Sequence, residues 1–140
     1  MRVLITGANG FVGQNLTTHL NEINGVEVIK YTRSNSLDEL PSLLAGVDCV
    51  VHLAGVNRPE SNDEFAKGNS DFTKSLLSVL SQQDRKIPVI YSSSIQAERD
   101  NPYGTSKRLA EDAVVSYGEE NDVAVKIYRL ANVFGKWCRP

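Results

Sequence analysis

The segment MRVLITGANGFVG, residues 1–13, decides the fold of this 140-residue chain. An apolar run over residues 3–5 ends at Thr6, and glycines follow at positions 7, 10 and 13. Such a run predicts a short buried strand. The apolar residues that come next recur at a helical spacing: Phe11, Val12, Leu16 and Leu20. The segment therefore predicts a strand, a glycine-rich turn and a helix.

The three glycines of this turn have three separate uses. A tight turn needs a residue without a Cβ, a diphosphate must come close to backbone N–H groups, and the helix packs on the sheet through a small residue. A glycine motif alone is weak evidence, but its place between a strand and a helix favours dinucleotide binding over an ordinary turn. The predicted cofactor contacts in this turn are Gly7, Asn9, Gly10, Phe11, Val12 and Gly13.

Strand and helix patterns alternate along the rest of the chain. Apolar runs predict strands over 26–31, 48–55, 87–94 and 123–135, and helical spacing predicts helices over 36–47, 71–83 and 103–120. The strands are continuous apolar runs, which is typical of a parallel sheet covered on both faces. The sequence thus predicts an α/β fold, a doubly wound parallel sheet of the Rossmann type, in one domain over residues 1–140.

Composition excludes several classes of function. The net charge of −2 gives no electrostatic basis for binding nucleic acid or an anionic membrane surface. Cys49 and Cys138 lack the spacing of a metal or redox site, so no metal is expected. The chain shows no signal peptide and no run long enough for a membrane span. These features predict a cytoplasmic protein with a reduced Cys49.

Polar or glycine residues follow each of the first four predicted strands. Because ligands of such sheets bind outside the carboxyl ends of the strands, we expect these residues to converge. After the second strand, a carboxylate would favour NAD by bonding the ribose 2′-hydroxyl, but Lys30 and Arg33 stand there instead. A guanidinium can pair with a 2′-phosphate through two hydrogen bonds. The sequence therefore predicts NADP(H) as the cofactor, with Arg33 as its phosphate contact.

The stretch NPYGTSK, residues 101–107, carries the predicted chemistry. Tyr103 and Lys107 are four residues apart, which places them on one face of a helix. An ammonium near the phenol lowers its pKa and can also hold the cofactor ribose. Ser94, at the end of the fourth strand, can bond a substrate oxygen, with Ser93 as the alternative. Together these predicted catalytic residues suit proton transfer to a carbonyl as a hydride arrives.

These motifs together resemble the extended short-chain dehydrogenases/reductases over nearly the whole chain. The resemblance rests on the glycine turn, on DCVVHLAG at 48–55, on the serines at 92–94 and on Tyr103 with Lys107. It implies a nucleotide cofactor and a nucleotide-sugar substrate, and subunits that pair as homodimers. It also implies that Asp48 contacts the adenine amine and that Asn69 supports the site. Further cofactor contacts are implied at Leu53, Ala54, Gly55, Tyr103 and Lys107.

A narrower resemblance is to the bacterial reductases of capsular polysaccharide synthesis. It rests on VHLAGVNRPE, SSSIQAERDNPYGTSK and NVFGKWCRP. It implies NADPH-dependent reduction of a 4-keto-6-deoxy UDP-N-acetyl-hexosamine to UDP-2-acetamido-2,6-dideoxy-L-talose. Members continue beyond the fifth strand, so the chain is expected to lack the C-terminal substrate lobe and to be inactive alone. The alternatives are another nucleotide-sugar epimerase or dehydratase, and a non-catalytic NADP-binding module.

Overall fold

The computed structural model describes residues 1–138 as five parallel strands with helices between them. The strands are β1 (Arg2–Thr6), β2 (Glu27–Tyr31), β3 (Cys49–His52), β4 (Val89–Ser94) and β5 (Val125–Leu130). The α-helices are α1 (Phe11–Asn21), α2 (Leu40–Leu43), α3 (Asp63–Phe65), α4 (Phe72–Ser81) and α5 (Pro102–Asn121). Shorter helical segments are η1 (Leu37–Glu39), η2 (Ala66–Asp71, a π-helix) and η3 (Ile95–Glu98).

The strand order is β2-β1-β3-β4-β5, and every pair is parallel. The chain winds outward from β1 to β2 and then returns past β1 to build the other half of the sheet. The reversal lies between β1 and β3, and sheets of this kind bind ligands beside such a point, at the carboxyl ends of the strands. The predicted doubly wound parallel sheet is confirmed.

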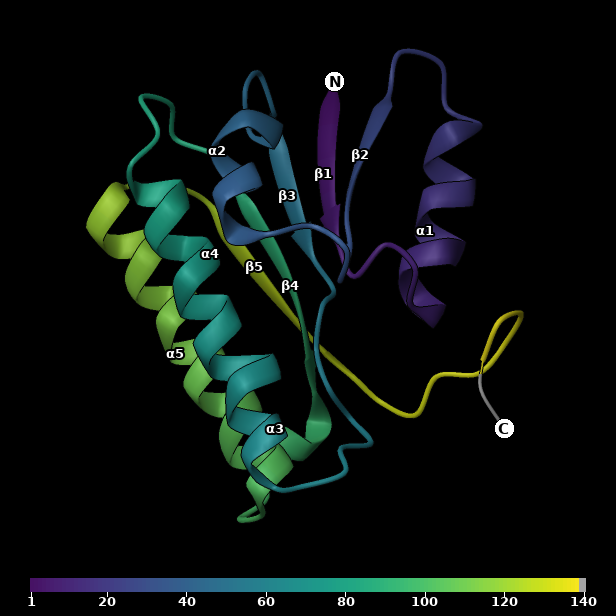
Figure 1. The fold of residues 1–140 in the computed structure, drawn as a ribbon, viewed down its shortest axis with the longest axis vertical. Coiled ribbons are helices and arrows are strands. Elements are labelled where there is room, and N and C mark those ends of the chain that lie inside the picture. The colour runs from purple at the N-terminus through teal and green to yellow at the C-terminus, as the bar shows by residue number, and fades with distance from the viewer. Residues whose placement is uncertain (139–140) are drawn as a thin grey trace.

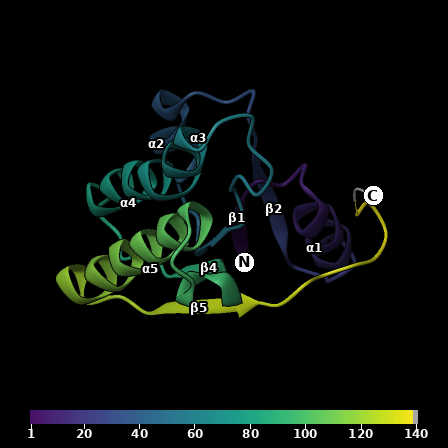
Figure 2. The same cartoon turned by 90° about the horizontal axis from the view of Figure 1, so that it is seen from below.

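Helices cover the two faces of the sheet unequally. Helices α2, α4 and α5 lie on one face and α1 lies on the other (Figures 1 and 2). The larger core cluster joins Leu4, Val50, Val89 and Tyr91 to α4 and α5, and a smaller one joins Val3, Ile5 and Val51 to α1. Tyr128, on the α1 face of edge strand β5, is 53% exposed. Within residues 1–138, cover by helices is therefore complete only on the α4–α5 face.

The segment after β5 crosses beyond the strand ends and reaches α1 (Figures 1 and 2). The Asn15 side chain of α1 donates a hydrogen bond from Nδ2 to the Lys136 carbonyl oxygen at 2.9 Å. Phe134, in this segment, is 91% exposed. This crossing segment therefore joins the last strand to the start of the fold at the edge where the predicted site lies.

The predicted helix over 36–47 is the element that differs most. The structure has a 3₁₀ turn, η1, followed by the four-residue α2, with Pro41 in the first turn of α2. Proline has no N–H to donate and restricts the residue before it, so it begins a new helix rather than continuing one. Leu40 and Leu44 are buried, whereas Leu37 is exposed.

No helix among residues 1–138 is long and apolar enough to cross a membrane.

Candidate active site

The glycine turn between β1 and α1 is built so that backbone approaches backbone. Gly7 has φ of +68° and donates its N–H to the Tyr31 carbonyl oxygen at 3.0 Å. A Cβ on Gly7 would lie 2.7 Å from the Ala54 nitrogen, and one on Gly13 would overlap the Gly7 carbonyl oxygen. No side chain caps the N-terminus of α1 at Gly10. The glycines therefore let the turn pack tightly against its neighbours, and the backbone N–H groups at the uncapped start of α1 are groups that a phosphate can bind.

The end of β3 closes the other side of this turn. Leu53 donates its N–H to the Thr6 carbonyl oxygen, and Ala54 donates to Thr6 Oγ1, each at 3.2 Å. A Cβ on Gly55 would lie 2.8 Å from Asn69 Oδ1. Leu53, Ala54 and Gly55 thus lie beside the glycine turn, as the sequence predicts for residues at one sheet edge.

His52 is fully buried beneath this edge. Its two ring nitrogens form hydrogen bonds with threonine hydroxyl groups. Nδ1 lies 2.6 Å from Thr6 Oγ1, and Nε2 lies 2.8 Å from Thr73 Oγ1. Because Thr73 donates its own proton to the Asn69 carbonyl oxygen at 2.6 Å, it accepts from Nε2–H. Burial, and secondarily the charge of Lys107, lower the pKa of His52 to about 3. His52 is therefore a neutral structural link between strands β1, β3 and helix α4.

Asn69 supports the site from the π-helical segment η2. Its Oδ1 accepts a hydrogen bond from Val56 N at 2.9 Å, and its Nδ2 donates to the Val56 carbonyl oxygen and to Ser106 Oγ. Ser106 in turn donates to the Tyr103 carbonyl oxygen at 2.7 Å. Short π-helical segments occur often at functional sites. Asn69 thereby ties the loop after β3 to the start of α5.

Helix α5 begins where the sequence predicts. Asn101 is its N-cap and accepts a hydrogen bond from Gly104 N at 2.8 Å, and Pro102 occupies the first helical position. A Cβ on Gly104 would overlap the Gln96 carbonyl oxygen, so only glycine lets the helix lie this close to η3. This start places Tyr103 and Lys107 on the helix face that points to β4.

Lys107 is buried, with 5% of its surface exposed. Its Nζ donates a hydrogen bond to the Ser92 carbonyl oxygen at 2.8 Å and lies 4.4 Å from the centre of the Tyr91 ring. Burial lowers the pKa of Lys107 to about 8, although the Glu111 carboxylate acts in the opposite direction. Neither Ser92 nor Tyr91 was among the predicted site residues. Their position on the strand that ends at Ser94 is the signal that could have found them.

Replacing Lys107 by methionine is expected to raise the free energy of unfolding at pH 7 by up to about 3 kcal/mol. The pKa of Lys107 falls from 10.5 in the unfolded chain to about 8 in the folded one. Between those values the unfolded state binds the extra proton, so wild-type stability rises with pH there and the variant's advantage shrinks. Urea unfolding at pH 7 and at about pH 9.5 measures both effects.

Lys86→Met is the control for this experiment, because Lys86 is exposed and pairs with Asp122 at the surface. It is expected to change the free energy of unfolding by no more than about 0.5 kcal/mol. Two results would show that burial of the ammonium is not costly in this fold. One is a Lys107→Met variant that is less stable than wild type at pH 7. The other is a variant whose gain in the free energy of unfolding is the same at both pH values.

The structure corrects one expectation about Tyr103. The sequence predicts that Lys107 lowers the pKa of this phenol, whereas burial raises it, opposed by a hydrogen bond with Ser94. The reason is geometric, because the Lys107 ammonium is directed at the Ser92 carbonyl oxygen and the Tyr91 ring. Tyr103 therefore keeps its proton at neutral pH and is placed beside Ser94.

The serines at the end of β4 divide between the two faces of the sheet. Ser93 is buried on the face of Val89 and Tyr91, towards α5. Ser94 is half-buried, and its Oγ accepts a hydrogen bond from Gln96 N at 3.2 Å, where the chain turns into η3. Ser94 rather than Ser93 acts on the pKa of Tyr103, lowering it against the effect of burial, which favours Ser94 as the serine of the site.

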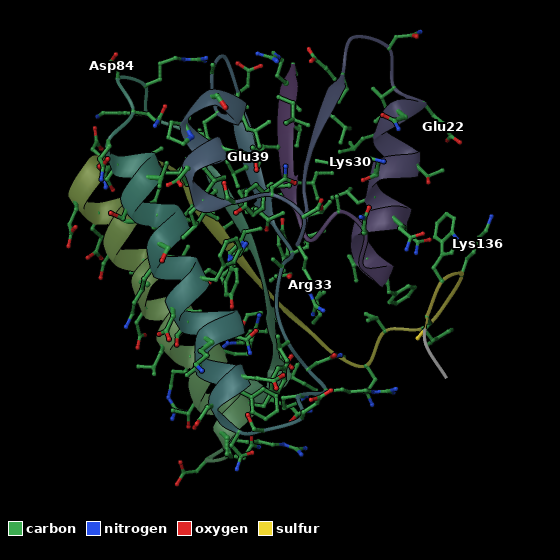
Figure 3. The ribbon with its side chains drawn as sticks, viewed as in Figure 1. Glu22, Lys30, Arg33, Glu39, Asp84 and Lys136 are labelled. Carbon is green, nitrogen blue, oxygen red and sulfur yellow. The ribbon has the colours of Figure 1, made fainter. Side chains whose placement is uncertain are left out.

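Arg33 and Asp48 lie at opposite ends of the sheet. Arg33 is exposed in the loop after β2 and extends below the ends of β1 and β2, while Lys30 lies between β2 and α1 (Figure 3). Asp48 precedes β3 and so lies at the amino ends, where its carboxylate accepts hydrogen bonds from Arg2 N and from Arg85. The structure thus does not bring Asp48 to the predicted site, and we leave it out of that site.

A model of the NAD dependent epimerase/dehydratase family matches residues 3–140. The chain belongs to this family. The matched residues include the glycine turn, the serine-ended strand and the helix that carries Tyr103 and Lys107. The resemblance to extended short-chain dehydrogenases/reductases is confirmed.

Two relatives are similar to this chain over its whole length. The chain is 54% identical over 140 residues to UDP-2-acetamido-2,6-beta-L-arabino-hexul-4-ose reductase of Pseudomonas aeruginosa and spans 38% of that protein's length. It is 41% identical to the capsular polysaccharide assembling protein CapF of Staphylococcus aureus, with a TM-score of 0.86. The match covers all of this chain and 37% of CapF.

A more distant solved structure shares the fold. The UDP-glucuronic acid 4-epimerase of Bacillus cereus, solved in complex with NAD, superposes with a TM-score of 0.88 at 20% identity. The match covers all of this chain and 60% of the epimerase. At that identity the likeness shows the fold alone.

Proposed function

We propose that this chain is the cofactor-binding part of an NADPH-dependent reductase. Its substrate would be a 4-keto-6-deoxy UDP-N-acetyl-hexosamine, and its product UDP-2-acetamido-2,6-dideoxy-L-talose. The observation that carries the proposal is the placing of Ser94, protonated Tyr103 and buried Lys107 at the same sheet edge as the glycine turn. The 54% identity to the Pseudomonas hexulose reductase supports the choice of substrate class.

The residues of this edge fit a dinucleotide. Gly7 and Gly13 let the turn pack directly against backbone atoms of Ala54 and Ala8, and the uncapped N-terminus of α1 suits the diphosphate. Arg33 would pair with a 2′-phosphate, because the loop after β2 places its guanidinium beyond the strand ends. Lys107 would hold the nicotinamide ribose. The bound cofactor would supply the hydride.

The chain's own residues would supply the proton and orient the substrate. Ser94 would hydrogen-bond the carbonyl oxygen at sugar position 4. Tyr103 would donate its proton to that oxygen, and its raised pKa keeps this proton in place at neutral pH. The Lys107 ammonium, directed at the Ser92 carbonyl oxygen rather than at the phenol, would act on the cofactor ribose and not on the phenolate.

Calorimetric titration with NADPH and then NADH tests the cofactor choice. We expect NADPH to bind more tightly, and Arg33→Ala to weaken NADPH binding by roughly tenfold to a hundredfold, because a charge-assisted pair to the phosphate is lost. NADH binding is expected to change by less than about twofold. The same titration is made on the Arg85→Ala variant.

Arg85 is the matched control because it is an exposed arginine at the opposite sheet edge, paired with Asp48. Its loss alters net charge as Arg33→Ala does but leaves the loop after β2 intact. Tighter binding of NADH than of NADPH would overturn the NADP assignment and favour an epimerase or dehydratase that uses NAD. Equal losses in Arg33→Ala and Arg85→Ala would exclude a specific phosphate contact.

A further inference from the structure

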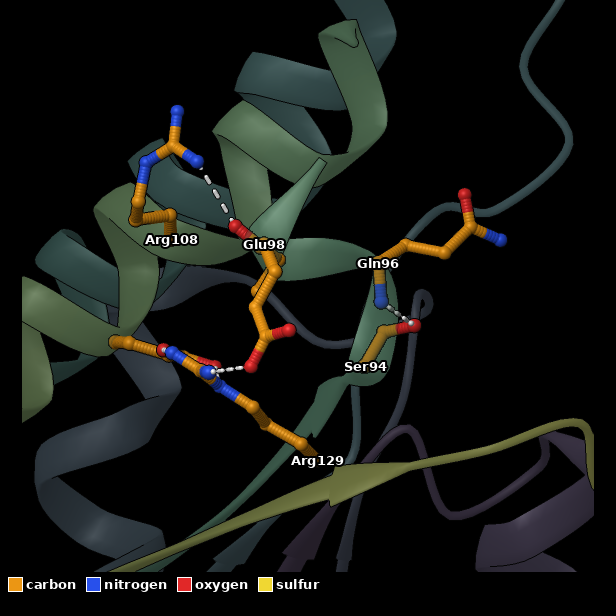
Figure 4. A network of polar contacts seen from close by, with 7 residues as sticks. Ser94, Gln96, Glu98, Arg108 and Arg129 are labelled. Carbon is orange, nitrogen blue, oxygen red and sulfur yellow. Dashed lines mark hydrogen bonds and ion pairs between the residues drawn. The ribbon is translucent and has the colours of Figure 1, made fainter. Parts of the chain in front are cut away.

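Arg129 of β5 joins three parts of the fold around the site. Its Nη2 and Nε donate hydrogen bonds to the Glu111 carboxylate of α5 at 2.7 and 3.0 Å. Its Nη1 donates to Glu98 Oε1 of η3 at 2.8 Å (Figure 4). Arg108 of α5 adds a hydrogen bond to the Ala97 carbonyl oxygen at 2.9 Å. The turn that follows Ser94 is therefore fastened to the helix that carries Tyr103 and Lys107.

Glu111 lies one helical turn beyond Lys107, on the same buried face of α5. Its side chain is 9% exposed, whereas the Glu98 side chain on the same guanidinium is 74% exposed. Burial raises the pKa of Glu111, but hydrogen bonds from Arg129 and Ser93, together with the charges of Arg129 and Lys107, outweigh burial and keep the pKa below its usual value. Glu111 is therefore a carboxylate at neutral pH, held in a site that would be costly for a charge without partners.

Besides Glu111, three titratable groups face Lys107. Tyr91 of β4 has a pKa raised by burial, His52 of β3 has one lowered by burial, and Tyr103 on α5 itself has a raised one. All three are neutral at pH 7. Among these neighbours in residues 1–138, Glu111 is thus the anion that acts on the ammonium.

We propose that Glu111, held by Arg129, is a positioning residue of the site. Its carboxylate keeps Lys107 charged, while the Arg129 guanidinium fixes the turn after Ser94 against α5. The role rests on the proposed function in one respect, because it takes Lys107 to be the lysine that faces the cofactor. A purely structural ion pair would affect stability but would leave the proton affinity of Lys107 unchanged.

NMR of the chain labelled with ¹³C in its lysine side chains, followed over pH, tests the proposal without cofactor. Lys107→Arg identifies the Lys107 signal. We expect Glu111→Gln to weaken proton binding at Lys107 about tenfold, since a negative charge one turn away is lost. Glu98→Gln, the same substitution on the same arginine, is expected to change proton binding by less than about twofold, because that carboxylate is exposed.

Equal effects of the two substitutions, or no effect of either, would overturn the proposal. The wild-type chain gives a second test should Glu111→Gln fail to fold. Its Lys107 signal is expected to shift a second time at acid pH, when Glu111 takes up its proton, and a signal that stays flat there would also overturn the role.

Adding NADPH separates this proposal from the proposed function. In Glu111→Gln, we expect NADPH affinity to fall at a pH about one unit lower than in wild type, because Lys107 loses its proton earlier. A wild type that binds no NADPH would overturn the proposed function but leave the Lys107 result standing. NADPH binding with an unmoved Lys107 in Glu111→Gln would overturn the positioning role alone.

Discussion

Gly7→Ala is expected to lower the free energy of unfolding by more than about 3 kcal/mol. The backbone of Gly7 has φ of +68°, which costs a residue with a side chain about 1–2 kcal/mol. The added methyl would also lie 2.7 Å from Ala54 N, 2.8 Å from Ala54 Cα and 3.0 Å from the Leu53 carbonyl carbon. These are backbone atoms of the neighbouring strand end, so the overlap is relieved only if β1 and β3 move apart.

Gly25→Ala separates the two causes. Gly25 has a similar φ of +80°, but a Cβ there would meet no heavy atom within 4 Å. This control is therefore expected to lose only about 1–2 kcal/mol, from the backbone conformation alone. Urea unfolding of both variants at pH 7 makes the comparison. Equal losses in the free energy of unfolding would mean that the contact between the glycine turn and Ala54 relaxes freely. That contact would then not constrain the sheet edge that is proposed to bind the cofactor.

The parallel sheet and the edge that carries the candidate site could be predicted because both follow from local patterns. Continuous apolar runs identify buried parallel strands, and the carboxyl ends of parallel strands share one edge. The meeting of Gly7, Ser94 and Tyr103 at one edge can therefore be predicted without any knowledge of side-chain contacts. The helix over 36–47 was predicted as one element because its leucines have helical spacing, but Pro41 divides it.

What the pattern could not supply is the direction of side chains and the pairing of distant charges. Asp48 stands in a motif that matches the family, yet it comes before its strand rather than after it and so lies at the wrong edge. The Lys107 ammonium is directed at Ser92 and Tyr91 rather than at Tyr103. Nothing in the local sequence links Glu111 to Arg129, since the two meet only when β5 packs beside α5.

Tyr103→Phe is expected to lower the rate of carbonyl reduction by about a hundredfold or more while NADPH affinity changes by less than about threefold. The substitution removes the proton that the substrate oxygen needs and leaves the ring in contact with Phe65, at 5.4 Å between ring centres. Lys107, Arg33 and the glycine turn, which would bind the cofactor, are unchanged.

The rate is measured in a chimera, because this chain matches only 38% of the Pseudomonas hexulose reductase. The chain replaces the segment of that enzyme with which it aligns, and the chimera is given NADPH and the keto-sugar nucleotide. Tyr128→Phe is the control, since Tyr128 is an exposed tyrosine on the edge strand, and it is expected to keep the wild-type rate. Full activity in Tyr103→Phe would exclude the phenol as the proton donor. A chimera that binds NADPH but reduces nothing would contradict the proposed reaction, because Ser94, Tyr103 and Lys107 would then be in place without the chemistry assigned to them.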